Sequence, residues 1–288
     1  MQELFTKITE KNLENKLYIV PTPIGNLQDI TIRALNVLAN CDIIFCEDTR
    51  ITKKMLNVYG INDKILYTYN NYSDDNQRNN IIGLIKDKNK SIALVSDAGT
   101  PLVSDPGYKL VEKCKQNGIE IVPLPGASAS ITAISACGLA TDKFLFYGFL
   151  QPKYKDKEKE IEKILTFPQT TICYETAIRL VDTLTIINNF NPNKKICVAR
   201  ELTKIFEDIK TDTANNLLDY YTNNSDKLKG EIVLVFDKNT TEKENNFIDR
   251  KLVETTLKYM TKKDCSIYLS EILNLNKKDI YDFILKNF

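Results

Sequence analysis

Short apolar runs alternate with amphipathic stretches through the first half of the chain. A short apolar run is typical of a buried strand, and apolar positions three and four residues apart are typical of a helix. The predicted strands are Leu17–Pro21, Asp42–Cys46, Lys64–Tyr69, Ser91–Val95 and Ile119–Pro123. The predicted helices are Thr31–Ala39, Ile51–Tyr59, Asn76–Lys88, Tyr108–Asn117 and Ala127–Cys137. This alternation predicts an α/β domain with a largely parallel sheet.

The second half repeats the alternation less regularly. The predicted strands are Phe144–Leu150, Thr171–Glu175, Ile196–Arg200 and Glu231–Asp237, and the predicted helices are Asp156–Leu165 and Ile178–Asn188. The stretch Lys238–Asn246 has no apolar residue and is typical of a linker, and three short helical patterns follow from Phe247. We therefore predict two α/β domains, 1–124 and 125–240, followed by a helical C-terminal segment, 241–288.

The composition is that of a soluble globular protein, because 43% of the 288 residues are apolar and 27% are charged. No stretch approaches the ~18 to 20 consecutive apolar residues that a membrane helix needs. Residues 1–16 are polar and amphipathic and lack the apolar core of a signal peptide. We therefore expect a cytoplasmic protein.

The sequence contains no histidine, and this absence excludes several kinds of chemistry at once. It removes Ser-His and Cys-His catalysis and all histidine metal ligands. The seven cysteines form no Cys-x-x-Cys pair, so they fit buried apolar positions better than a zinc site. A general base must then be a carboxylate, Lys, Tyr, Cys or water.

The net charge of +1 does not favour a free-standing nucleic-acid-binding module, which is usually more basic. A local basic patch stays open as an alternative. The many lysines between Lys153 and Lys163 are more typical of a solvated helix face than of such a patch.

Three loops share one arrangement, in which a strand is followed by Gly, Pro, Asp or Ser residues and then by a helix. They are PTPIGNLQD (Pro21–Asp29), SDAGTPLVSDPG (Ser96–Gly107) and PLPGASAS (Pro123–Ser130). In a parallel sheet all three lie at the carboxyl ends of the strands, where open α/β sheets bind ligands. Each loop alone is consistent with an ordinary capped turn, but the three together favour a small-molecule site. None matches the glycine patterns of a Rossmann dinucleotide site or a P-loop.

Acidic residues in or near these loops are candidates for contact with a cation. Asp97 and Asp105 lie in the second loop, and a partly desolvated carboxylate stabilises a bound metal, amine or sulfonium. For Asp105, before Pro106-Gly107, a turn cap is the favoured interpretation. The segments CEDTR (Cys46–Arg50) and ARELTK (Ala199–Lys204) place acids beside bases after a strand. Surface ion pairing, worth ~0 to 1 kcal/mol, and a polar wall facing a substrate are both consistent with them.

Taken in order, these segments resemble one family, the ribosomal RNA small subunit methyltransferase I family of the tetrapyrrole methylase superfamily. The similar segments are LYIVPTPIGNLQDIT, IIFCEDTR, ALVSDAGTPLVSDPG, PLPGASA, FLFYGFLQPK, CYETAIR, VARELTK and KGEIVLV. The resemblance runs from about Lys16 to Asp237, and the helical tail also looks like the family's C-terminal segment. Several motifs in the same order are more specific than any one of them.

The resemblance implies both a fold and an activity. The implied fold has two α/β domains of tetrapyrrole methylase type with the cofactor in a cleft between them, in a homodimer. The implied activity is transfer of a methyl group from S-adenosylmethionine to the ribose 2′-hydroxyl of cytidine 1402 in 16S rRNA, within the small ribosomal subunit.

The resemblance also assigns residues by motif. Those implied to line the cofactor pocket are Pro23, Asp97, Ala98, Gly99, Thr100, Pro101, Ala127, Ser128, Ala129, Ser130, Tyr174, Ala199, Gly230 and Glu231. Those implied to face the RNA or the reacting hydroxyl are Glu47, Asp48, Arg50, Arg200, Glu201 and Lys204. Arg50, Arg200 and Lys204 would hold phosphates. Since histidine is absent, Glu47 or Glu201 is the expected proton acceptor, with Asp48 a weaker candidate; no metal is expected.

One segment departs from the family pattern. The family usually has Tyr-Glu-Ser-Pro-His-Arg where this chain has YETAIR (Tyr174–Arg179). If the family's histidine positions RNA or moves a proton, this chain must do so differently.

Two other functions stay open at the level of sequence. A methyltransferase acting on a tetrapyrrole needs a cleft ringed by Arg and Lys, because that substrate carries many carboxylates, whereas Glu47, Asp48 and Glu201 are acids. Its corrin enzymes also have a more glycine-rich first loop than TPIGN. A non-catalytic RNA-binding assembly factor would hold the cofactor only structurally. The tail lysines could contact phosphates, or the tail could cap a domain or a dimer; these lysines are Lys262, Lys263, Lys277 and Lys278.

Overall fold

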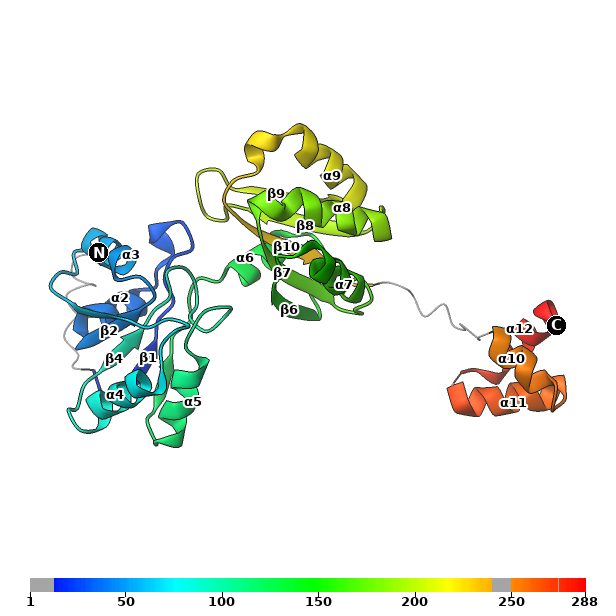
Figure 1. Cartoon of the computed structure of the whole chain (residues 1–288), viewed down its shortest axis with the longest axis horizontal. Helices are drawn as coiled ribbons and strands as arrows, with labels where there is room; N and C mark the ends of the chain where they lie inside the picture. Colours follow the sequence, from blue (N-terminus) through cyan, green and yellow to red (C-terminus); the bar gives the residue numbers. More distant parts are fainter. Residues whose placement is uncertain (1–12, 240–249, 274) are drawn as a thin grey trace. The chain divides into compact units, whose positions relative to one another are not determined.

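The computed structural model describes residues 13–239, 250–273 and 275–288. These residues form two compact units (Figure 1). The first comprises residues 13–165 and 169–237 and contains two sheets, and the second comprises residues 166–168 with the described residues from 238 onward. Within the first unit we call residues 17–123 the first lobe and residues 129–236 the second lobe, because each contains one sheet.

The first lobe contains five parallel strands in the order β3-β2-β4-β1-β5. The strands are β1 (Leu17–Ile19), β2 (Ile43–Cys46), β3 (Ile65–Thr68), β4 (Ile92–Leu94) and β5 (Ile121–Pro123). The helices are η1 (Leu27–Asp29), α2 (Ile32–Asn40), α3 (Thr49–Val58), α4 (Asp75–Lys86) and α5 (Tyr108–Gln116). The predicted parallel α/β sheet is confirmed, and β1 lies between β4 and β5.

Side-chain alternation along β1 explains why helices cover both faces of this sheet. Leu17 and Ile19 join a core with residues of α4 and α5, whereas Tyr18 and Val20 join a core with residues of α2 and α3. Successive side chains of a strand point to opposite faces, so a strand buried on both faces must be apolar throughout. That is the physical basis of the short apolar runs in the sequence.

The second lobe has a mixed sheet in the order β6-β7-β10-β8-β9. Its strands are β6 (Phe144–Phe149), β7 (Thr170–Thr176), β8 (Lys195–Arg200), β9 (Asp208–Thr213) and β10 (Glu231–Phe236). Only β6 and β7 are parallel neighbours; the other pairs are antiparallel. The ends of β7 and β8 and the start of β10 therefore lie at one edge of the sheet.

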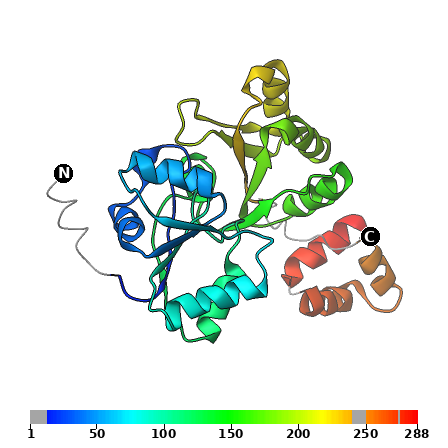
Figure 2. The same cartoon turned by 60° about the vertical axis from the view of Figure 1, so that its left-hand side comes forward.

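Helices cover both faces of this second sheet as well. They are α6 (Ala129–Ala136), α7 (Tyr154–Ile164), η2 (Ala177–Arg179), α8 (Leu180–Phe190), α9 (Ala214–Asn223) and η3 (Ser225–Lys227). α6 shares a core with Ile172 and Val233. On the opposite face Glu175 contacts Lys157 of α7 and Thr183 of α8, and α7, α8 and α9 pack in sequence (Figure 2).

The sequence pattern does not predict β9 or α9, and each omission has a physical reason. β9 is an edge strand that pairs only with β8, so its polar sequence, DIKTDT, is tolerated. Its single apolar residue, Ile209, packs against the core beside α6. α9 buries only Ala214, Leu217 and Tyr221, which is a weak helical pattern over ten residues.

The second unit has α10 (Arg250–Leu257), α11 (Lys262–Leu273) and α12 (Lys277–Asn287). Its core consists of Val253, Cys265, Leu269, Ile280 and Ile284. Three helical patterns were expected in this region, and three helices are present among the described residues. The predicted linker Lys238–Asn246 lies mostly outside the described residues, and the three-domain division at 124 and 240 stays a prediction. In the described part of the chain, no helix combines the length and apolarity that crossing a membrane requires.

Candidate active site

The three predicted loops meet at one edge of the first sheet and are joined by hydrogen bonds. Thr22 of the first loop and Gly99 of the second exchange two backbone hydrogen bonds, each of 2.9 Å. The hydroxyl of Thr100 in the second loop donates to the carbonyl oxygen of Ala127 in the third, at 2.9 Å. This convergence follows from the strand order, because β4, β1 and β5 are neighbours and all end at the same edge.

A pocket of about 360 Å³ is lined by these loops and by the second lobe. That volume is in the range of small-molecule sites. The residues of the predicted cofactor set that line it are Asp97, Ala98, Gly99, Thr100, Ser128, Ala129, Tyr174, Ala199, Gly230 and Glu231. Those of the same set that are not among its lining residues are Pro23, Pro101, Ala127 and Ser130. Ala127 contacts the pocket wall indirectly, because its carbonyl oxygen accepts a hydrogen bond from the lining residue Thr100.

Three carboxyl groups of the first lobe line this pocket, on Glu47, Asp97 and Asp105. Burial, followed by the negative charges of Asp105 and Asp97, raises the pKa of Glu47 to about 7. Burial raises the pKa of Asp105 to about 6, although a hydrogen bond from the Ser96 hydroxyl opposes the shift. Burial also raises the pKa of Asp97, which accepts a hydrogen bond of 3.1 Å from the backbone N–H of Asp48.

Within the described residues, none of these three carboxyl groups forms an ion pair with Lys or Arg, and no Lys or Arg side chain lines the pocket. Three close acids without a counterion repel one another, and this repulsion is relieved when a cation binds. The electrostatics of the first-lobe wall therefore favour a positively charged ligand.

The second lobe supplies the apolar wall. Tyr174 lies on β7 between Phe146 and Phe149, with ring centroids at 5.0 and 5.2 Å. Burial raises the pKa of the Tyr174 hydroxyl, and hydrogen bonding to Ser130 opposes this shift. Ala199 and Val233 complete this wall. Such a surface accommodates a flat heterocyclic ring.

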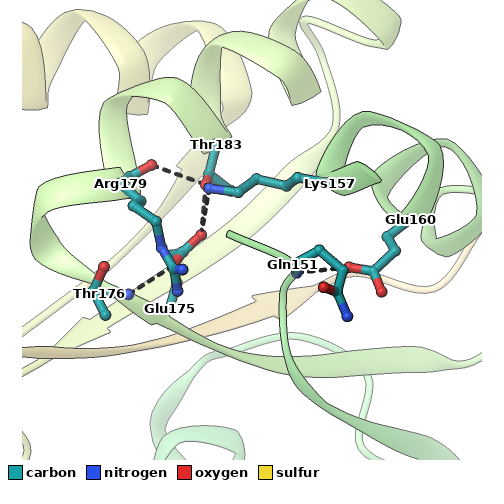
Figure 3. Close-up of polar contacts among 7 residues, drawn as sticks. All are labelled: Gln151, Lys157, Glu160, Glu175, Thr176, Arg179 and Thr183. Carbon is teal, nitrogen blue, oxygen red and sulfur yellow. Dashed lines mark hydrogen bonds and ion pairs between the residues drawn. The ribbon is translucent and has the colours of Figure 1, made fainter. Parts of the chain in front are cut away.

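A buried polar network lies on the other face of β7 (Figure 3). The Glu175 carboxylate is bound by Lys157 Nζ at 2.8 Å, by Arg179 Nη2 at 2.6 Å and by the Thr183 hydroxyl at 2.8 Å. It also accepts from the backbone N–H of Thr176 at 2.8 Å. The network fixes the end of β7, and with it the adjacent pocket residue Tyr174.

The lysines at positions 153, 155, 159 and 163 are exposed, as the interpretation of a solvated helix face predicts, and Lys157 is the exception. Its side chain is only 2% exposed, because α7 turns this position toward the sheet. Its neighbour Glu160 accepts a hydrogen bond from the backbone of Gln151 at 2.8 Å, which ties α7 to the chain leaving β6 (Figure 3). The helix spacing predicts which residues share a face, but only Glu175 on a distant strand explains why one of them is a lysine.

Glu201, a predicted base, is part of a structural contact. Lys204 Nζ binds Glu201 Oε1 at 2.9 Å and Glu231 Oε2 at 3.0 Å, and the backbone N–H of Glu231 donates to Glu201 Oε1 at 3.1 Å. Burial acts to raise the pKa of Glu201, but these hydrogen bonds outweigh burial, so the pKa is lowered overall. Gly230 has φ +87°, and a Cβ there would lie 2.0 Å from Glu201 Oε1. Glu201 and Lys204 are not among the lining residues of the pocket.

The remaining predicted RNA-facing residues differ in exposure. Asp48 caps α3, and a hydrogen bond from the Arg50 side chain lowers the pKa of Asp48 to about 2. The Arg50 side chain is 85% exposed. Arg200 is buried, and its Nη2 donates to the carbonyl oxygen of Phe206 at 3.0 Å. The placement of Arg200 therefore favours anchoring of the loop after β8 over contact with a phosphate.

Asp105 corrects the interpretation of that residue as a turn cap. The N-cap of α5 is Gly107, and it makes no side-chain capping bond. Leu102 and Ser104, with φ of 72° and 69°, coil the preceding loop so that Asp105 lines the pocket. The available sequence signal was a second acid in the loop of Asp97. Apolar lining residues such as Ile24 and Ile232 carry no local signal of a ligand site.

The described residues contain no group of three or more His, Cys, Asp or Glu side chains placed to hold a metal ion. All seven cysteines are buried and free, as their apolar surroundings in the sequence predict. The segment that departs from the family pattern ends β7 and forms η2, where Ile178 is 90% exposed.

Comparison with known proteins identifies relatives over most of the chain. The model of the family described as Tetrapyrrole (Corrin/Porphyrin) Methylases matches residues 16–218. The chain is 44% identical over 269 residues to the ribosomal RNA small subunit methyltransferase I of Rickettsia prowazekii, covering 93% of this chain and 94% of that protein. It is 39% identical over 278 residues to the protein of the same name from Escherichia coli O157:H7, covering 96% of each.

Solved structures show the same fold at low sequence identity. A diphthine synthase matches with a TM-score of 0.58 at 17% identity, over 77% of this chain and 89% of that one. The uroporphyrin-III C-methyl transferase of Thermus thermophilus complexed with S-adenyl homocysteine matches with a TM-score of 0.53 at 12% identity, over 77% and 97%. The two-sheet architecture is thus that of the tetrapyrrole methylases.

Proposed function

This chain belongs to the tetrapyrrole methylase family and, within it, to the ribosomal RNA small subunit methyltransferase I family, and on that premise we propose that it methylates ribosomal RNA. The chain is an S-adenosylmethionine-dependent methyltransferase. The specific reaction is methylation of the ribose 2′-hydroxyl of cytidine 1402 in 16S rRNA. The observation that carries the proposal is the pocket whose three first-lobe acids, Glu47, Asp97 and Asp105, lack a cationic partner among the described residues.

The residues of the pocket fit this cofactor in charge and shape. A sulfonium and an α-ammonium are both cations, and Glu47, Asp97 and Asp105 supply carboxyl groups whose mutual repulsion a cation relieves. The wall around Tyr174 and Phe149 suits a flat purine ring. A substrate with many carboxylates, such as a tetrapyrrole, would be repelled by the same acids.

When bound, the cofactor would supply an electrophilic methyl group on a positively charged sulfur, with a neutral thioether as the leaving group. The chain's residues orient the reacting groups and accept the proton that the hydroxyl loses. Glu47 is best placed for this, because it lines the pocket and its pKa of about 7 is close to working pH. Asp48 and Glu201 are bound to cations, so their carboxylates are weaker bases.

The RNA would reach the pocket as a single-stranded or distorted segment, since one ribose must be presented alone. We also propose that the protein acts as a homodimer on the small ribosomal subunit in the cytoplasm, because the family resemblance implies that assembly and ribosomal RNA is the substrate. Sedimentation of the purified protein tests the dimer: a monomer across the working concentration range contradicts it.

The activity is tested by incubating the purified protein with small ribosomal subunits that lack the modification and with methyl-labelled S-adenosylmethionine. We expect label on the ribose of cytidine 1402, mapped by nuclease digestion and mass spectrometry. Binding of the cofactor is measured separately by calorimetry. Label on a tetrapyrrole instead of RNA, or cofactor binding without any labelled product, contradicts the proposal and identifies one of the two alternative functions.

A further inference from the structure

A second cavity, of about 330 Å³, lies on the first lobe beside α3 and β3. Three cationic side chains line it, those of Arg50, Lys53 and Lys64, and Asp63 is the single acid among its described lining residues. Its volume is at the lower end of the range for ligand sites. The methyl-transfer mechanism uses none of its lysines.

We propose that this cavity binds backbone phosphates of the RNA substrate next to the nucleotide that is methylated. The inference rests on the proposed function, and it identifies where that substrate is held. Cations grouped in a concave surface attract a polyanion more strongly than the same charges spread over a convex one.

Arg50 is paired with Asp48, whereas the two lysines of the cavity have N–H donors available to a ligand. Lys53 is exposed and, within the described part of the chain, makes no hydrogen bond or ion pair. Lys64 Nζ donates to the carbonyl oxygen of Cys41 at 2.6 Å, and an ammonium group has two further N–H donors. The Thr49 hydroxyl and the Asn57 amide add neutral donors. Side chains of these types make most contacts to phosphate oxygens in nucleic-acid complexes.

The position of the cavity relates it to the reaction. Glu47 lines the active-site pocket, whereas Thr49, two residues later, lines the second cavity. Two residues of extended chain span at most about 7 Å, so the two sites are neighbours. A strand whose ribose enters the pocket can therefore place an adjacent phosphate in the cavity. The partial positive charge at the start of α3 acts in the same direction.

The test compares Lys53→Glu with Lys54→Glu. Both lysines are exposed on α3, but only Lys53 lines the cavity, so the control makes the same charge change one residue away. With small ribosomal subunits as substrate, we expect Lys53→Glu to raise KM about 3- to 10-fold, and Lys54→Glu to change it less than about twofold. The kcat value and calorimetric cofactor affinity stay unchanged in both.

Salt dependence provides a readout that a structural role of Lys53 would not alter. A 16S rRNA fragment that contains the target nucleotide is titrated at several salt concentrations. Loss of one phosphate contact in Lys53→Gln should reduce the slope of log K against log salt by about 0.7. A titration with inorganic phosphate examines the other source of the same ligand. Tight phosphate binding that depends on Lys53 but leaves RNA affinity unchanged would overturn the inference.

The outcomes are separable from failure of the proposed function. If the wild-type protein methylates no RNA, the proposed function fails. If it methylates RNA and the Lys53 and Lys54 variants behave alike, whether both are impaired or neither is, the cavity is not a phosphate site. Unfolding curves of both variants exclude misfolding as the cause of a raised KM.

Discussion

The acids that line the pocket differ between the two lobes in whether a cationic side chain pairs with them. In the first lobe Glu47, Asp97 and Asp105 share one pocket without a cationic partner among the described residues, and their pKa values are raised. In the second lobe Glu175 is neutralised by Lys157 and Arg179, and Lys204 bridges Glu201 and Glu231.

This difference separates acids that act from acids that support. Keeping close carboxyl groups without a counterion destabilises the folded protein, so such an arrangement points to a function that requires it. Paired acids gain their stabilisation within the chain and are less available to a substrate. The first lobe therefore supplies the reactive charge, and the second lobe supplies a rigid, mostly apolar wall.

The largest difference between the two lobes is expected when each predicted base, Glu47 or Glu201, is replaced by glutamine. We expect Glu47→Gln to lower the rate of methyl transfer ~10²- to 10⁴-fold, because the hydroxyl loses its proton acceptor. Glu201→Gln should lower it less than about tenfold, through loss of the Lys204 contact. Single-turnover rates at saturating cofactor measure both. A larger effect of Glu201→Gln would reverse the assignment.

The buried network of the second lobe gives the next largest effect. Lys157→Ala removes one partner of a buried ion pair, and we expect a loss of about 3 to 5 kcal/mol in the free energy of unfolding. Urea denaturation measures this loss. The matched control is Lys159→Ala, an exposed position of the same helix, which should change the free energy by less than about 0.5 kcal/mol. Equal values would show that Lys157 does not hold the lobe together.

The contact between Glu201 and Lys204 in the second lobe is tested by substitution of Gly230. Gly230→Ala forces Glu201 away from Lys204 and strains a residue with φ +87°, so we expect about 1 to 3 kcal/mol of lost stability together with weaker cofactor binding. Gly118 has φ +69°, and a Cβ added there would meet no atom within 4 Å, so Gly118→Ala carries the strain alone. Calorimetry should show unchanged cofactor affinity in Gly118→Ala. An equal loss of cofactor affinity in both variants would contradict the role of Glu201.

The smallest expected effect is the pH dependence of the first-lobe acids. The pKa values of about 7 for Glu47 and about 6 for Asp105 mean that both carboxyl groups take up protons as the pH falls from about 8 to about 5.5. A cation binds the ionised forms, so cofactor affinity should fall over this range by about tenfold or less, with proton uptake opposing binding. Calorimetry in buffers of different ionisation enthalpy measures the released protons.

The stability of the cofactor-free protein should change in the opposite direction. Raised pKa values mean that the folded state binds more protons than the unfolded state, so the contribution of these groups to stability falls as the pH rises from about 4 through 7. Asp105→Asn should flatten the lower part of both profiles. Parallel profiles of stability and affinity would show that these carboxyl groups do not face the cofactor.

Much of the fold could be predicted because burial imposes local patterns. The apolar run from Leu17 indicates a strand that is buried on both faces, and the spacing of apolar residues in Ile32–Asn40 indicates which face of that helix is buried. Where burial is one-sided or slight, as in Asp208–Thr213 and Ala214–Asn223, the pattern is too weak to predict an element. The position of Asp97 at the pocket follows from its loop at the carboxyl end of a parallel strand, whereas Tyr174 and Gly230 were assigned by the family resemblance alone.

The sequence by itself determined the parallel first sheet, the convergence of three loops at its edge and the absence of histidine chemistry. Those features follow from chain-local periodicity and from composition. Only the tertiary structure decided which acids carry a counterion, because Glu175 meets Lys157 and Glu47 meets Asp105 across long separations in the chain. Electrostatic interaction depends on distance in space and on burial, and neither quantity can be predicted from the order of the residues along the chain.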